Sequence, residues 1–293
     1  MKKTGIIVLL AFLASCNTNN KESDAYGNFE ATETIISAET GGKIVFLNAE
    51  EGAKIDMGTC VAIIDTTDLL LKLQQLDAQK RAIQSRSENV FSQIEVYNQQ
   101  KENLKKDSLR LDNLVKEGAA TQKQLDDIIG AINLINKQIK ATETQNISVI
   151  NEMSVVDKQI EQVKENIRKC YITMPFTGSI LEKYTEKYEL VNPGKPLFKT
   201  ACLDSLFLRA YISGKQLSGL KIGQKVGVKV DTDGQGMKTT EGVVTWIAAD
   251  AEFTPKIIQT KEERVNLVYA VKIKTANDGT LKIGMPAEVV FSK

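Results

Sequence analysis

An apolar residue recurs at every seventh position through two long stretches in the middle of the chain. The first series is Leu69, Leu76, Ile83, Val90, Tyr97, Leu104 and Leu111. The second series is Leu125, Ile132, Ile139, Asn146, Met153, Ile160 and Ile167. This periodicity is typical of helices that bury one stripe against each other. Because no proline occurs before Pro175, nothing interrupts long helices here, and we predict a coiled-coil hairpin over residues 67–169.

The two series are separated by a short break at residues 116–121. Gly118 suits the position just after the end of the first helix, and Thr121 suits the N-cap of the second. A short break between arms of equal length predicts that the helices fold back antiparallel. A hairpin this long is a spacer or a docking arm, since it buries little besides its own seam.

Polar residues enter the seam at several points. Lys80, Ser87, Lys101 and Ser108 stand at the second seam position of the first arm, so the surface facing them must be partly polar or shared with a neighbour. Asn146 is the only Asn at the first seam position of the second arm. Because a buried amide fixes register at a cost in stability, we expect Asn146→Leu to raise thermal stability.

The hairpin interrupts an internal repeat. Residues 36–65 align without a gap with residues 172–201, and both halves carry strand-like runs and turn glycines at matching positions. Neither half could bury a face alone, so the halves 27–66 and 170–202 must pair into one small β-sandwich. Residues 203–293 then carry about six short strands with glycine-containing connections, which predicts a small β-barrel. Within it, Leu220-Lys221-Ile222-Gly223 recurs as residues 281–284, each time before a strand.

The first residues form an export signal. Lys2 and Lys3 precede an apolar run that is too short to span a bilayer, and the run ends in Leu13-Ala14-Ser15-Cys16. We interpret residues 1–15 as a lipoprotein signal peptide and Cys16 as the lipidated residue, with an ordinary signal peptide as the alternative. Residues 16–26 then form a tether. The other cysteines, at positions 60, 170 and 202, stand beside apolar residues and favour buried free thiols over a disulfide.

Composition excludes several kinds of chemistry. The chain has 293 residues, 38 Lys and Arg, 37 Asp and Glu, and no His, so it can hold no His-dependent catalytic relay or Cys/His zinc site. The near-neutral charge gives no basic face for nucleic acid. Asp126 and Asp127 point about 100° apart on a helix, so they form no pair on one face. We expect no enzyme activity, no metal and no cofactor.

Several motifs together resemble HlyD-type periplasmic adaptors, also called membrane fusion proteins. Residues 41–44, 51–52 and 57–58 are similar to the first half of a biotinyl/lipoyl-like domain, and residues 174–178 and 191–194 to its second half. A true carrier would display a modifiable Lys at the turn that the hairpin replaces, and Lys72 lacks the flanking methionines. The stretch from Phe253 to Tyr269 is similar to adaptors of ABC-type exporters.

This resemblance implies a fold class and a set of partners. The fold is an elongated α+β chain, with the hairpin inserted in a lipoyl-like sandwich and a β-barrel with a short membrane-proximal C-terminus after it. The function is an adaptor, lipid-anchored in the periplasm and most often to the inner membrane, that links an ABC-type transporter to a TolC-like outer-membrane channel. Self-assembly into a hexamer is implied as well. The alternatives are an adaptor of a proton-driven RND pump and a structural coiled-coil lipoprotein.

The hairpin tip carries the candidate docking residues. Arg110, Leu114 and Thr121 resemble, in type and spacing, the Arg-Leu-Ser motif with which adaptors dock TolC-like channels, with Thr in place of Ser. Because Leu111 faces the other arm, Arg110 and Leu114 lie outside the main seam, where a partner could reach them. The alternative is a routine N-cap at Thr121 beside an exposed Arg.

Overall fold

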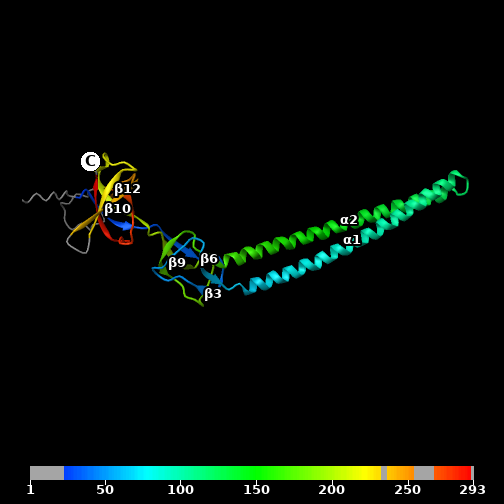
Figure 1. Ribbon diagram of the computed structural model, residues 1–293, viewed down its shortest axis with the longest axis horizontal. Helices are drawn as coiled ribbons and strands as arrows, with labels where there is room; N and C mark the ends of the chain where they lie inside the picture. The colour runs from blue at the N-terminus through cyan, green and yellow to red at the C-terminus, as the bar shows by residue number, and fades with distance from the viewer. Residues whose placement is uncertain (1–22, 232–235, 254–266, 292–293) are drawn as a thin grey trace, which may run out of the picture.

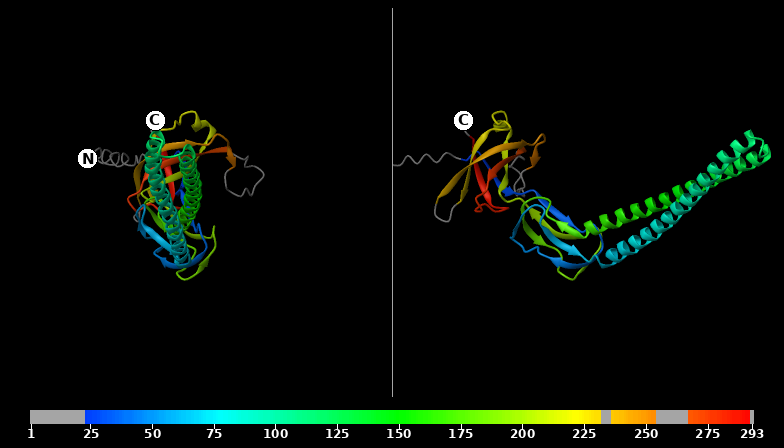
Figure 2. Two further views of the ribbon diagram at one scale, coloured as in Figure 1. Left: turned by 90° about the vertical axis from the view of Figure 1, so that its right-hand side faces the viewer. Right: turned by 45° about the vertical axis from the view of Figure 1, so that its right-hand side comes forward.

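The computed structural model describes residues 23–231, 236–253 and 267–291. The molecule is elongated, with a β-barrel at one end, a β-sandwich next to it and a helical hairpin that projects from the sandwich (Figure 1). The described chain begins in the barrel, and the hairpin tip lies at the opposite end of the molecule (Figure 2). The predicted fold class is confirmed.

The hairpin consists of α1 (Thr67–Lys116) and α2 (Gln122–Lys169). A helix of 50 residues is about 75 Å long at 1.5 Å per residue. In the half nearer the sandwich, predicted seam residues form one apolar cluster: Leu76, Ile83, Val149, Val156, Ile160 and Val163. Ion pairs flank this cluster, with Lys80 Nζ 2.7 Å from Asp157 and Arg86 2.9 Å from Glu152. The polar seam residue Lys80 thus lies at the margin of the cluster.

A polar layer closes the apolar cluster toward the tip. Asn146 is 5% exposed and Ser87 is 8% exposed, and the Ser87 hydroxyl donates to Asn146 Oδ1 over 2.9 Å. The seam position of Asn146 is therefore as the heptads predict. The polar residue on the first arm is thus the hydrogen-bonding partner of Asn146, and this bond reduces the gain in stability expected from Asn146→Leu.

The sandwich has two four-stranded sheets, in the orders β2-β9-β7-β4 and β6-β5-β3-β8. Its first-half strands are β2 (Glu33–Ser37), β3 (Gly42–Leu47), β4 (Lys54–Ile55) and β5 (Cys60–Ile64). Its second-half strands are β6 (Tyr171–Thr173), β7 (Gly178–Lys183), β8 (Leu190–Val191) and β9 (Pro196–Ala201). Each sheet takes two strands from each half, and the two orders interconvert when equivalent strands of the repeat are exchanged. The halves thus complete each other around an internal two-fold relation.

The barrel closes with six strands in the order β10-β1-β15-β11-β12-β14, because β14 also pairs with β10, and β13 adds to the edge of β14. These elements are β1 (Ala25–Glu30), β10 (Ser205–Ser213), α3 (Gly214–Leu217), β11 (Lys225–Asp231), β12 (Met237–Ile247), β13 (Glu252–Phe253), β14 (Leu267–Ala276) and β15 (Pro286–Phe291). The two copies of the Leu-Lys-Ile-Gly sequence, at residues 220–223 and 281–284, form similar turns. Gly223 and Gly284 both have positive φ, and Leu220 and Leu281 are buried in the barrel core.

The first strand belongs to the barrel, which corrects the expected tether 16–26 and half-domain 27–66. β1 lies between β10 and β15 and is antiparallel to both, and Phe29 is buried in the barrel core. Gly27 permits the close approach to β10, since a Cβ there would lie 2.0 Å from the Arg209 carbonyl oxygen. The remaining barrel strands cannot close without β1, although β1 is far from them along the sequence.

The three described cysteines are free thiols in different surroundings. Cys170 is buried and Cys60 is half-buried, and burial raises the pKa of both thiols. Cys202 is exposed, so the expectation of burial is wrong for this residue. It lies in the connection from β9 to β10, where the chain leaves the sandwich core. Nearby, Lys54 of the sandwich pairs with Asp204 over 2.7 Å.

Candidate functional site

The turn at the hairpin tip is built from two complementary caps. Gly118 has a φ of 78°, and its N–H donates to the Val115 carbonyl, while the Ala119 N–H donates to the Leu114 carbonyl. This pair of bonds is a Schellman motif, which glycine favours because it has no Cβ. The predicted role of Gly118 is confirmed, and the turn holds both arms in a fixed geometry.

Thr121 begins the second arm as an N-cap. Its side chain accepts from the Gln124 N–H over 3.4 Å, and its own N–H donates to Gln124 Oε1 over 2.9 Å, which makes a capping box. The hydroxyl that the tip motif would offer to a channel is therefore engaged within the hairpin, although the residue is exposed. The cap expected as the alternative role of Thr121 is present.

Arg110 and Leu114 lie one turn apart on α1 and are both exposed. Arg110 pairs with Asp107 on its own helix over 3.2 Å, and such a pair is worth little in water. The guanidinium can therefore exchange this partner for another carboxylate or a carbonyl group at small cost. Leu109, which the sequence reasoning missed, is 69% exposed beside them. Its position outside the heptad seam is the signal that could have identified it.

The tip half of the hairpin is less tightly packed than the base half. Beyond Val90 no residue of α1, which the structure describes completely, is fully buried. In α2 the same half buries only Leu125 and Ile139. Lys101 and Ser108 at the seam explain this difference, because they bring no apolar surface to the contact. The structure thus places the candidate tip residues on the part of the hairpin with the least buried seam.

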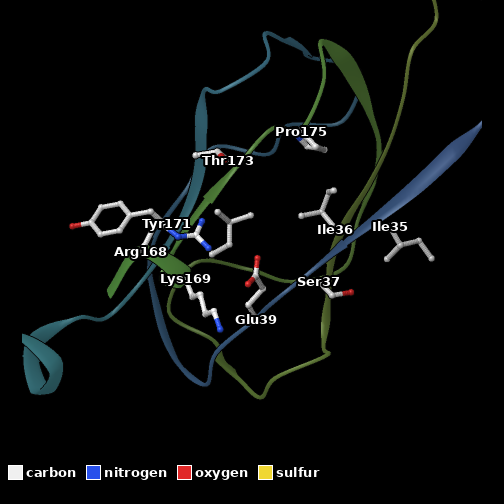
Figure 3. Close-up of a pocket in the computed structure, with 10 residues that line it drawn as sticks. Ile35, Ile36, Ser37, Glu39, Arg168, Lys169, Tyr171, Thr173 and Pro175 are labelled. Carbon is white, nitrogen blue, oxygen red and sulfur yellow. The ribbon is translucent and has the colours of Figure 1, made fainter. Parts of the chain in front are cut away.

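A hollow of about 240 Å³ lies where the hairpin meets the sandwich, between the edge strands β2 and β6 (Figure 3). Ile36 on β2 and Ile172 on β6, equivalent positions of the repeat, both line it, and Arg168 and Glu39 extend toward its middle. Only Cys170 separates α2 from β6. The direction of the second arm is therefore set directly by a sandwich strand.

Two further kinds of feature are absent from the described residues. Among them, no three Cys, Asp or Glu side chains lie close enough together to hold a metal ion. No helix in the described ranges is long and apolar enough to cross a membrane. Cys16 and residues 254–266, which include most of the stretch that resembles ABC-type adaptors, lie outside the described residues.

Comparison with known proteins agrees with this architecture. No protein-family model matches the chain. A UPF0194 membrane protein of Yersinia pseudotuberculosis is 24% identical over 318 residues, which cover 98% of this chain and 96% of that protein. The membrane fusion protein Spr0693 from Streptococcus pneumoniae R6 has a TM-score of 0.59 at 12% identity, covering 92% of this chain and 97% of that one. The periplasmic adaptor protein EmrA has a TM-score of 0.50 at 16% identity, covering 92% and 98%.

The chain therefore has the fold of membrane fusion and periplasmic adaptor proteins over nearly its whole described length. The resemblance to HlyD-type adaptors is confirmed at this level.

Proposed function

We propose that this chain is the adaptor subunit of a tripartite export system in the periplasm, linking an inner-membrane transporter to a TolC-like outer-membrane channel. The observation that carries the proposal is the placement of a hairpin of about 75 Å at the end of the molecule opposite the first described residues. Such an arm can reach a partner far from the membrane that holds the other end. The chain acts as a scaffold and performs no chemistry.

The membrane anchor in this proposal is a lipid on Cys16. Six residues separate Cys16 from Ser23, where the described chain enters the barrel. A segment that short keeps the barrel close to the membrane surface, because extended chain spans about 3.5 Å per residue. We assign the anchor to the inner membrane, where the transporter resides.

The transporter in this proposal is an ABC-type permease with its ATPase. The support is the resemblance of the stretch from Phe253 to Tyr269 to adaptors of such exporters, and the names of the similar structures do not decide the class. Affinity purification of the tagged protein from membranes tests this assignment. Co-purification of an ATP-binding protein and its permease is expected, and recovery of a proton-driven pump instead would contradict it. We further assign a ring of six copies, in which sandwich and barrel layers surround a conduit.

The channel-docking surface in this proposal is formed by Arg110, Leu114 and Thr121. Arg110 supplies a charge-assisted donor and Leu114 an apolar contact, which suits a small interface at a helical tip. Thr121 contributes by capping α2, which keeps the tip in shape. The neighbouring Leu109 adds exposed apolar surface.

The double variant Arg110→Asp/Leu114→Asp tests docking. Export should be lost in a strain without the wild-type copy, while expression, lipidation and helix content stay unchanged. Val155→Asp/Lys158→Asp is a matched control near the base, because Val155 is exposed and Lys158 pairs with an acid on its own helix, as Arg110 does. The control should export normally. Normal export by the tip variant would refute the docking assignment, and loss of export by both would show that acidic substitutions act on the hairpin as a whole.

A further inference from the structure

Tyr188 has a backbone conformation that its side chain disfavours. Its φ is 77°, and it is the only non-glycine residue with positive φ in the described part of the chain. Such a conformation is costly for a residue with a bulky Cβ substituent. The equivalent position in the first half of the repeat is Gly52, with a φ of 84°. The fold therefore forms this turn with glycine in one half, and the tyrosine adds nothing that the turn itself requires.

The Tyr188 side chain lies on the surface between two lysines. It is 63% exposed, and Lys43 Nζ and Lys187 Nζ lie 5.2 Å and 4.8 Å from the ring centroid. The Tyr188 N–H donates to the Ile44 carbonyl over 2.8 Å, which holds the loop against β3. Leu190, two residues after Tyr188, is 73% exposed. We call Lys43, Lys187, Tyr188 and Leu190 the Tyr188 patch.

The composition of this patch is that of a protein interface. An exposed aromatic ring and a leucine form its centre, and cations form its rim. Neither lysine forms an ion pair with any residue in the described ranges. The patch therefore fits an acidic surface that also offers an apolar contact.

Glu186 and Glu189 beside Tyr188 are paired with Lys183 and Lys195, so the unpaired charges of that loop are the two lysines. The unpaired charges of the equivalent loop in the other half of the sandwich have the opposite sign. Glu50 and Asp56 flank β4, are exposed and form no ion pair within the described chain, and Met57 beside them is 71% exposed. We call Glu50, Asp56 and Met57 the Glu50 patch. Its loop is bonded to β7 through the Gly52 N–H, which donates to the Ile180 carbonyl.

The internal two-fold relation keeps the two patches apart. β7 and β3 belong to different sheets, so the Tyr188 patch and the Glu50 patch lie on different sheets of one sandwich. They are complementary in charge, and a thioether is a favourable contact for an aromatic ring. Each patch therefore finds its complement on a second copy of the chain.

We propose that the Tyr188 patch of one copy docks on the Glu50 patch of the next. This is a heterologous contact, in which each copy uses one patch toward each neighbour, and it closes into a ring when the rotation between neighbours allows. The inference rests on the proposed self-assembly and identifies the surfaces that carry it. The cost of the Tyr188 backbone is then offset by the contact that its ring makes in the assembly.

Removal of the tyrosine ring separates assembly from folding. In the full chain, purified from membranes in detergent, Tyr188→Gly and Tyr188→Asn should raise the dissociation constant for self-association at least about tenfold, as measured by sedimentation velocity. Both residues tolerate positive φ, so the melting temperature of the dissociated protein should equal or exceed that of wild type. Unchanged association in both variants would overturn the proposal.

A charge exchange tests the partner surface. Lys187→Glu and Glu50→Lys should each weaken self-association, and the double variant should recover it, because each contact then joins the exchanged charges. Lys215→Glu is the matched control, since Lys215 is an exposed lysine on the barrel without an ion pair to described residues, and it should associate as wild type does.

Failure of recovery in the double variant, or a wild-type chain that stays monomeric at all concentrations, would overturn the proposal. The tip variants report on channel docking independently, so failure of this contact and failure of the proposed function are distinguishable. If the patch binds the transporter instead, Tyr188→Gly would lose transporter co-purification while self-association persists, which also overturns it.

Discussion

Replacement of the buried Ser87–Asn146 pair measures what a polar layer costs the hairpin. Asn146→Leu removes one hydrogen bond, worth about 0.5–1.5 kcal/mol, and leaves the Ser87 hydroxyl buried without its partner. Burial of the leucine side chain stabilises the folded state by about 2 kcal/mol. We therefore expect the single variant to change the free energy of unfolding by less than about 1 kcal/mol, where the sequence alone suggested clear stabilisation.

A second substitution, Ser87→Ala, removes the buried hydroxyl that Asn146→Leu leaves without a partner. Ser87→Ala alone should destabilise by about 1 kcal/mol, because it leaves the Asn146 amide unpaired. Ser87→Ala/Asn146→Leu should be more stable than wild type by about 1–2 kcal/mol, since no polar group then stays buried without a partner. The four proteins form a double-mutant cycle with an expected coupling energy of about 2–3 kcal/mol.

Urea denaturation followed by circular dichroism at 222 nm gives the four stabilities, because the hairpin supplies nearly all the helix of the molecule. Asn151→Leu, on the exposed surface of the same helix, should shift stability by less than about 0.5 kcal/mol. A coupling energy below about 0.5 kcal/mol would refute the hydrogen bond. Stabilisation of more than about 2 kcal/mol by Asn146→Leu alone would restore the simpler view from the heptads.

Three further predictions concern other parts of the chain. Gly27→Ala should destabilise the barrel by about 2 kcal/mol or more, seen as a lower melting temperature, because the new Cβ would press β1 away from the Arg209 carbonyl; an unchanged melting temperature would contradict the pairing of β1. Lys238 and Thr280 hold the pKa of Asp278 well below its usual range, so this carboxylate stabilises the fold above its unfolded pKa and that contribution disappears as pH falls further; Asp278→Asn should flatten the acid side of a melting-temperature profile, and a profile parallel to wild type would exclude the effect. Cys16→Ala should abolish incorporation of labelled fatty acid, and persistent labelling would show that the lipid is attached elsewhere.

Local signals in the sequence predicted the parts of the fold that depend on local geometry. The seven-residue period located the seam because side-chain period and helix geometry are linked. Gly118 and Thr121 were identified because each residue type suits one cap. The repeat predicted a sandwich shared by two halves, because neither half could bury its own face.

Long-range pairings could not be predicted in the same way. Strand β1 has no local feature that assigns it to a barrel whose other strands begin at Ser205. Ser87 and Asn146 each looked like a defect in the seam, because the heptads give the face of each residue but not its partner on the other arm. Tyr188 was overlooked because positive φ is evident from sequence only where glycine or asparagine stands.

In the proposed function the chain is exported, and the place of β1 then determines the order in which its fold is completed. Ser23 and Glu288, which bond to each other where β1 meets β15, are separated by 265 positions, so the barrel cannot close until β15 has crossed the membrane. The hairpin consists of local contacts and can form well before that moment. During this interval β1 has a free edge, which is a site for pairing with other chains. The first strand of the barrel to leave the membrane is thus among the last to gain both neighbours, and it needs protection for as long as secretion lasts.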